Sequence, residues 1–255
     1  IADGIRNRGI EVPLFTADGT DDHMLLNGGV DGIYKAVKFG ANGERHFDAL
    51  KYFQPEGPLF CSEFWNGWYD EWEYKHYQRA PKDAAVAMSR TLKCGASLNT
   101  YMFCGGTNFG FMNGANCDYE YKSVTSSYDN DALLTESGAY TNKYKLMKEL
   151  LSKYTEIPAD IAMEPEVQKV RYGKVQFTHF ANLFDNLDVL SIPVRSKNPM
   201  PMEKYGQGYG LILYRKMVKG PRDYMPLVIN EVHDRAKIFL YNKFYADQNR
   251  NDEPS

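Results

Sequence analysis

Four apolar, strand-like segments alternate with helix-like segments in the first part of the chain. The strand-like segments are residues 12–16, 33–39, 58–63 and 97–103, and the helix-like segments are residues 45–54, 81–94 and 142–154. Strands that alternate with helices pair in parallel, because each crossover helix returns the chain to the same end of the sheet. Residues 1–155 are therefore expected to form parallel β/α units.

The sequence changes character after Tyr154. Residues 157–166 have the composition of a linker, with Pro158 and Pro165 near its two ends. Residues 172–180, 210–215 and 235–245 then alternate apolar and polar side chains, as half-buried antiparallel strands do. We therefore expect a second domain at residues 156–255, β-rich, sandwich-like and incomplete.

The composition excludes several classes of function. A formal charge of -3 and a pI near 6.0 offer no general attraction for nucleic acid. The chain has no apolar run of about 18 residues, so we expect no membrane span. Its 4 cysteines form no C-x-x-C pair and its 5 histidines are scattered, so we expect no metal or organic cofactor.

Glu63 is the candidate catalytic residue. It ends the third strand-like segment and is followed by Trp65 and Trp68. Parallel barrels present catalytic side chains at the carboxyl ends of their strands. A carboxylate stabilises the oxocarbenium-like transition state of glycoside cleavage, and indoles offer flat faces to a sugar ring. The residues by themselves fit an ordinary alternative equally well, namely a buried, ion-paired glutamate among core tryptophans.

Five stretches in order resemble glycoside hydrolase family 35, the β-galactosidases. They are residues 14–19 (LFTADG), 62–72 (SEFWNGWYDEW), 95–103 (GASLNTYMF) with 105–109 (GGTNF), 113–116 (NGAN) with 127–129 (SYD), and 232–236 (VHDRA). The second stretch resembles the family's nucleophile motif and contains Glu63. Five motifs in one order are much more specific than any one of them.

The resemblance implies a TIM barrel followed by β-sandwich domains, and a retaining double displacement by two carboxylates roughly 5 Å apart. The first strand-like segment resembles strand five of the family's barrel, so residues 1–155 correspond to the C-terminal half of a (β/α)8 barrel. The family's acid/base motif is expected upstream of Ile1, in the missing N-terminal half of the barrel. A fragment without it is expected to be inactive alone. The family also favours a secreted, periplasmic or lysosomal location, although no segment from Ile1 to Ser255 encodes one.

The resemblance also assigns substrate contacts. Tyr101 matches a family tyrosine whose hydroxyl faces the sugar and the nucleophile, and Trp68 matches an aromatic residue beside the pocket. Asn130 stands where the family has a tyrosine that contacts the sugar, so it can donate hydrogen bonds but cannot stack. Asp18 is a second carboxylate, but its Ala-Asp-Gly setting favours a turn and hydrogen-bonding role.

Three functions remain open. The first is a retaining exo-β-galactosidase that releases terminal galactose from a glycan. The second is a catalytically inactive galactose-binding remnant that keeps only the shape of the pocket. The third is a hydrolase for another sugar, such as a β-glucosamine or arabinose-type glycoside. The reason to consider it is that Asn130 replaces the family's tyrosine.

Overall fold

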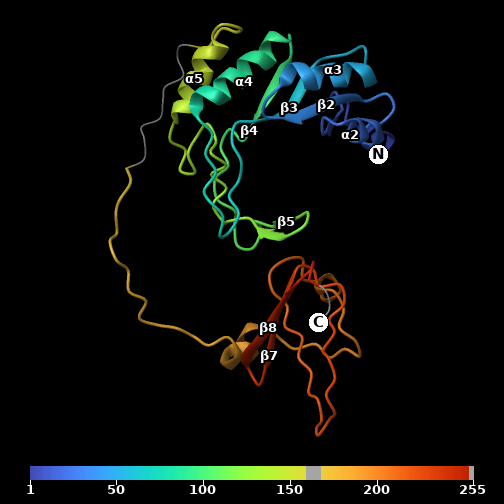
Figure 1. Ribbon diagram of the computed structural model, residues 1–255, viewed down its shortest axis with the longest axis vertical. Coiled ribbons are helices and arrows are strands. Elements are labelled where there is room, and N and C mark those ends of the chain that lie inside the picture. Colours follow the sequence, from blue (N-terminus) through green and yellow to red (C-terminus); the bar gives the residue numbers. More distant parts are fainter. Residues whose placement is uncertain (159–167, 253–255) are drawn as a thin grey trace. The chain divides into compact units, whose positions relative to one another are not determined.

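The computed structural model describes residues 1–158 and 168–252 and divides into two compact units (Figure 1). The described residues of the first unit are 1–108 and 125–158, and those of the second are 109–124 and 168–252. Within the described residues, no helix is long and apolar enough to cross a membrane. The predicted linker at residues 157–166 lies mostly outside the described residues.

The first unit is built on a four-stranded sheet in which every strand is parallel to its neighbour, which confirms the predicted parallel arrangement. The strands lie in the order β1 (Phe15–Asp18), β2 (Tyr34–Phe39), β3 (Phe60–Trp65) and β4 (Ser97–Tyr101). The first strand begins three residues later than predicted. Pro13 has no N–H to donate to a neighbouring strand, so regular pairing starts after it.

The helices of the first unit are α1 (Ala2–Arg6), α2 (Asp22–Asn27), α3 (Gly43–Phe53), α4 (Pro81–Lys93) and α5 (Asn142–Leu151). The last three correspond to the predicted helices within a few residues. Helix α2 was not predicted, although Asp21 is a clear signal for its start. The Asp21 side chain accepts a hydrogen bond from the backbone N–H of Met24 at 2.9 Å and so caps the helix.

The hydrophobic core lies between the sheet and helices α3, α4 and α5 (Figure 1). Strand residues point into it, among them Val37 and Phe39 of β2 and, on either side of a register shift, Cys61 and Phe64 of β3. The helices contribute residues at helical spacing: Phe47 and Leu50 of α3, Ala84, Ala87 and Met88 of α4, and Met147 of α5. This core holds β3 and β4, the strands that carry two of the predicted site residues.

The second unit has less regular structure than the sequence predicts. Its elements are β5 (Ala115–Cys117), β6 (Tyr121–Ser123), η1 (Phe184–Asn186), α6 (Leu187–Leu190), η2 (Met202–Tyr205), β7 (Arg235–Leu240) and β8 (Lys243–Asn249). Residues 172–180 and 210–215, predicted as strands, carry no regular secondary structure. An alternating segment becomes a strand only when a partner pairs its backbone and covers one face, yet Phe177 and Phe180 are almost fully exposed.

The third predicted strand, residues 235–245, is instead an antiparallel hairpin of β7 and β8. Tyr241 and Asn242 form its turn, and both have positive φ angles, 51° and 62°. Two consecutive residues in this conformation are typical of the tightest hairpin turns, where asparagine is favoured. The alternating pattern therefore predicted strand structure correctly here but missed the reversal of direction.

Candidate active site

Glu63 lies in β3, two residues before the end of the strand. The sequence placed it at the strand end, but β3 continues because Trp65 is in register with Tyr101 of β4. The Glu63 side chain is half-buried and accepts a hydrogen bond at Oε2 from the Trp65 indole N–H at 3.0 Å. Within the described part of the chain Glu63 forms no ion pair with an arginine, so the alternative of a buried, ion-paired glutamate finds no support.

Aromatic rings follow Glu63 along the chain. The rings of Trp65 and Trp68 meet edge to face with their centroids 5.2 Å apart, and the ring centroids of Trp68 and Tyr69 are 4.9 Å apart. Tyr69 in turn stacks on Tyr128, with the ring planes 12° apart. Trp68 is 37% exposed, so part of its indole face is open to a ligand.

Tyr101 is the last residue of β4, beside Trp65 on the neighbouring strand. Its hydroxyl lies 3.4 Å from the hydroxyl of Tyr128. Burial raises the pKa of the Tyr128 hydroxyl, and the contact with Tyr101 and the nearby Glu63 carboxylate raise it further. Tyr128 therefore joins Glu63 and Tyr101 in the candidate site as a neutral hydroxyl. No role was predicted for Tyr128, although it lies in one of the five stretches that resemble the family.

Asn130 is buried and has a left-handed backbone with φ of 58°. Its side-chain oxygen accepts a hydrogen bond from the backbone N–H of Met102 at 3.4 Å. The side chain therefore links the loop that contains Asn130 and Asp131, the 130s loop, to the end of β4. Little of the Asn130 side chain is accessible to a ligand.

Asp18 ends β1, which is two strands away from β3 in the sheet. It is 8% exposed, and its Oδ2 accepts a hydrogen bond from the Thr16 hydroxyl at 2.5 Å. This placement agrees with the predicted hydrogen-bonding role. It does not pair Asp18 with Glu63 as a second catalytic carboxylate.

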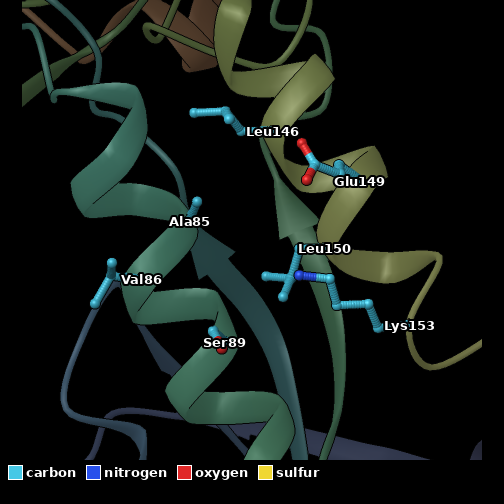
Figure 2. Close-up of a pocket in the computed structure, with 7 residues that line it drawn as sticks. All are labelled: Ala85, Val86, Ser89, Leu146, Glu149, Leu150 and Lys153. Carbon is cyan, nitrogen blue, oxygen red and sulfur yellow. The ribbon is translucent and has the colours of Figure 1, made fainter.

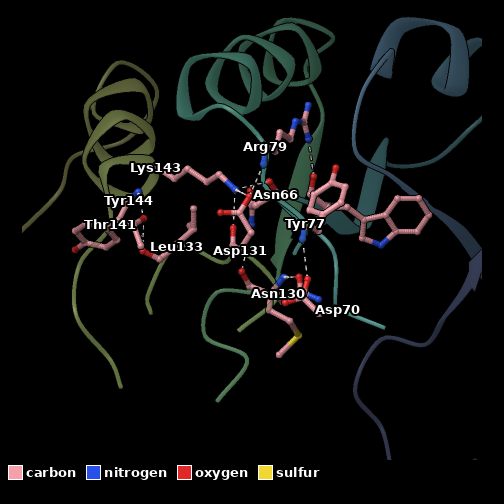
Figure 3. Close-up of polar contacts among 12 residues, drawn as sticks. Asn66, Asp70, Tyr77, Arg79, Asn130, Asp131, Leu133, Thr141, Lys143 and Tyr144 are labelled. Atoms are coloured by element: carbon pink, nitrogen blue, oxygen red, sulfur yellow. Dashed lines mark hydrogen bonds and ion pairs between the residues drawn. The ribbon is translucent and has the colours of Figure 1, made fainter. Parts of the chain in front are cut away.

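A cluster of charged residues lies directly after β3 and was not predicted (Figure 3). Lys143, at the start of α5, is 2% exposed and forms an ion pair with Asp131. Burial lowers the pKa of Lys143 and the Asp131 carboxylate opposes that shift. The sequence does hold a signal, since a lysine in the first turn of a helix faces the positive end of the dipole and calls for a compensating partner.

One hollow of the surface lies between α4 and α5, lined by Ala85, Val86, Ser89, Leu146, Glu149, Leu150 and Lys153 (Figure 2). Its walls are mainly apolar and come from α4, α5 and Lys153, which lies just past the end of α5. None of these residues belongs to the group around Glu63. We assign no role in the candidate site to this hollow.

Comparison with known proteins identifies relatives of the chain. Residues 2–154 match the family model for glycosyl hydrolases family 35. The chain is 37% identical over 237 residues to a β-galactosidase of Bos taurus and 38% identical over 233 residues to one of Xanthomonas manihotis. It is also 36% identical over 254 residues to a β-galactosidase-1-like protein 3 of Homo sapiens.

These alignments include 89–96% of this chain but only 36–38% of each relative. The chain therefore spans less than two-fifths of the length of the relatives that it matches.

Proposed function

Because this chain belongs to family 35 of the glycosyl hydrolases, we propose that it is part of a retaining exo-β-galactosidase, with Glu63 as the nucleophile. The observation that supports the proposal is the position of Glu63 in a parallel strand, two residues before the Trp65 that pairs with Tyr101, with a hydrogen bond from the Trp65 indole to one carboxylate oxygen. That bond leaves the other oxygen to attack the anomeric carbon. Attack forms a glycosyl-enzyme ester and releases the aglycone, and water then hydrolyses the ester.

The substrate contacts in this proposal are Trp68, Tyr101 and Asn130. The exposed part of the Trp68 indole packs on the apolar face of the galactose ring, and the Tyr101 hydroxyl, next to Tyr128, bonds a sugar hydroxyl. Asn130 contributes only its amide N–H groups, because it is buried and its side-chain oxygen accepts from the backbone N–H of Met102. Replacing the family's tyrosine by Asn130 therefore reduces the contact with the sugar.

In the same proposal, residues 1–155 are the C-terminal half of a (β/α)8 barrel and residues 156–255 belong to a β-rich domain. The acid/base and the N-terminal half of the barrel then come from outside this chain. The short share of each relative that the chain covers supports this division. So does Asp18, a buried carboxylate that lies two strands from Glu63 rather than beside it.

The test of the nucleophile uses Glu63→Gln in the protein that carries this chain, with Glu56→Gln as the control at an exposed position. We expect Glu63→Gln to lower hydrolysis of an aryl β-galactoside by about a thousandfold or more, the scale of removing a covalent nucleophile. A dinitrophenyl 2-fluoro-galactoside should label Glu63, as mass spectrometry of peptides would detect. Its leaving group needs no proton, so labelling reports on the nucleophile alone. Labelling of another residue would contradict the assignment.

A second candidate function is an inactive galactose-binding remnant that keeps only the shape of the pocket. It predicts galactose binding without labelling of Glu63 and without turnover. A third candidate is hydrolysis of another glycoside, and the presence of Asn130 in place of the family's tyrosine is the reason to consider it. Rates on a panel of aryl glycosides separate it from galactoside hydrolysis.

A further inference from the structure

Arg79, Asp131 and Lys143 form a group that we call the clamp, and it contacts Trp65, the last residue of β3, and Asn66, which follows it (Figure 3). The guanidinium of Arg79 donates to the backbone carbonyl of Trp65 at 2.7 Å. The ammonium of Lys143 donates to the carbonyl of Asn66 at 3.0 Å and to that of Asp131 at 2.6 Å. Two cations thus hold two consecutive carbonyls at the end of the strand that carries Glu63.

Asp131 connects the two cations. Its Oδ2 accepts a hydrogen bond from the backbone N–H of Arg79 at 2.6 Å and is also the atom that pairs with the Lys143 ammonium. A buried ammonium is expensive unless a carboxylate and further acceptors surround it. Lys143 has both, which makes its position well determined.

Asn66 and Gly67 form the turn that follows β3, and they connect it to the end of β4 and to the loop that contains Asn130. The Asn66 backbone N–H donates to the Tyr101 carbonyl, and its side-chain N–H donates to the Met102 carbonyl, both at 3.3 Å. Asn66 is fully buried, and among the described residues its side-chain oxygen finds no donor. A Cβ at Gly67 would come within 2.1 Å of the Asn130 carbonyl, so this loop and the 130s loop are in direct contact.

These contacts also set the position of Trp65. Arg79 holds the Trp65 backbone carbonyl, and the Trp65 indole N–H donates to Glu63. Given the proposed function, on which this inference rests, we propose that Lys143 is a positioning residue for Glu63. It acts through Asp131 and the Trp65–Asn66 turn to keep the indole N–H on Oε2. The rival role for Lys143 is purely structural, a buried ion pair that stabilises the fold and leaves Glu63 unaffected.

The first test observes the indole directly. In the protein that carries this chain, the indole N–H resonances of the chain's 3 tryptophans can be assigned in a nitrogen-15 correlation spectrum by substituting each tryptophan in turn. We expect Glu63→Gln to shift the Trp65 indole resonance, and Lys143→Met to shift it as well. Lys145→Met, which removes the same charge from an exposed position of α5, should leave it in place. An unchanged Trp65 resonance in folded Lys143→Met overturns the inference.

The second test uses kinetics in the protein that carries this chain. We expect Lys143→Met to lower kcat about 10- to 100-fold, the effect of misplacing a reacting group by about 1 Å, with little change in KM. Labelling of Glu63 by the 2-fluoro-galactoside should slow by a similar factor. Normal kcat and labelling with only a lower resistance to urea identify the structural role and overturn the inference.

A further variant covers the case in which Lys143→Met does not fold. Arg79→Gln removes the bond to the Trp65 carbonyl but keeps the backbone N–H that bonds Asp131. It should shift the Trp65 resonance and lower kcat, and Arg79→Lys should recover part of both. If neither changes in Arg79→Gln, the clamp does not position Glu63. Failure of the proposed function would give a different result. The Glu63→Gln protein would keep its hydrolytic activity, although the shifts of the indole resonance would still occur.

Discussion

At the scale of single residues, the candidate site depends on pairs of neighbours rather than on isolated side chains. Glu63 is oriented by an indole two residues further along its own strand, and Tyr101 by the hydroxyl of Tyr128. The recognised stretches predicted Glu63 and Tyr101, because each follows from a local motif. They could not predict the Tyr101–Tyr128 contact, which joins residues 27 positions apart.

Asn130 and Asp131 adopt consecutive left-handed conformations, with φ angles of 58° and 46°. Asparagine and aspartate tolerate this region better than other residues with a side chain. The tyrosine that the family has at position 130 would have a higher conformational free energy in the same left-handed backbone. The change to Asn130 thus fits the local conformation as well as altering the proposed sugar contact.

A pH-dependent contribution to stability is expected from His76, whose Nδ1 lies 2.6 Å from Oδ2 of Asp70. The bond to Asp70 raises the pKa of His76 above its ordinary 6.5. A raised pKa in the folded state means that the stabilisation is complete below 6.5 and is lost as the pH rises through the folded value. The free energy of unfolding should therefore differ more between wild type and His76→Asn at about pH 5.5 than at about pH 8.5.

Urea unfolding at the two pH values measures this difference. His23→Asn, at an exposed position of α2, is the control. A His76→Asn effect of equal size at both pH values would show that the bond to Asp70 contributes no pH-dependent stability.

At the scale of elements, the helices and strands of the first unit follow from local patterns, but their contacts do not. Helix α4 shows this well, with Pro81 in its first turn and apolar residues spaced to bury one face. It contacts α3 at Gly43, where a Cβ would lie 2.7 Å from the hydroxyl oxygen of the buried Thr91. Glycine at this position lets the two helices pack together.

Gly43→Ala should therefore destabilise the first unit by about 1–3 kcal/mol, because the added methyl group overpacks the contact with Thr91. Gly4→Ala is the matched control, since the nearest atom to its Cβ is a guanidinium nitrogen of Arg8 at 3.6 Å. The better helix propensity of alanine should leave that variant equal to or more stable than wild type. Urea unfolding of both variants measures the effect, and equal stability would show that the α3–α4 contact can relax.

At the scale of the whole molecule, the four parallel strands have two edges, at β1 and β4. In the proposed barrel these edges pair with strands from outside the chain, which also bring the proton donor. The proposal predicts that the 255-residue chain alone does not hydrolyse a nitrophenyl β-galactoside, whereas the longer protein does. Assays of both proteins at equal concentration test this. Turnover by the chain alone that disappears in Glu63→Gln would contradict the proposal.

The alternation of apolar segments and the five motifs were enough to predict the parallel β/α units, the family and the strand that carries Glu63. These features are local, because a period of hydrophobicity or a short motif is complete within a few residues. Two strand predictions in the second unit were wrong for the converse reason. A strand also needs a neighbour, and no local pattern supplies one.

The tertiary structure alone decided which distant groups meet. Lys143 bonds the carbonyl of Asn66 across 77 positions, and Arg79 bonds Asp131 across 52. Such contacts arise because an ammonium or a backbone N–H can be buried at low cost only where the folded chain brings acceptors around it. The residues that can act chemically are visible in the sequence, but the groups that hold them in place are determined by packing.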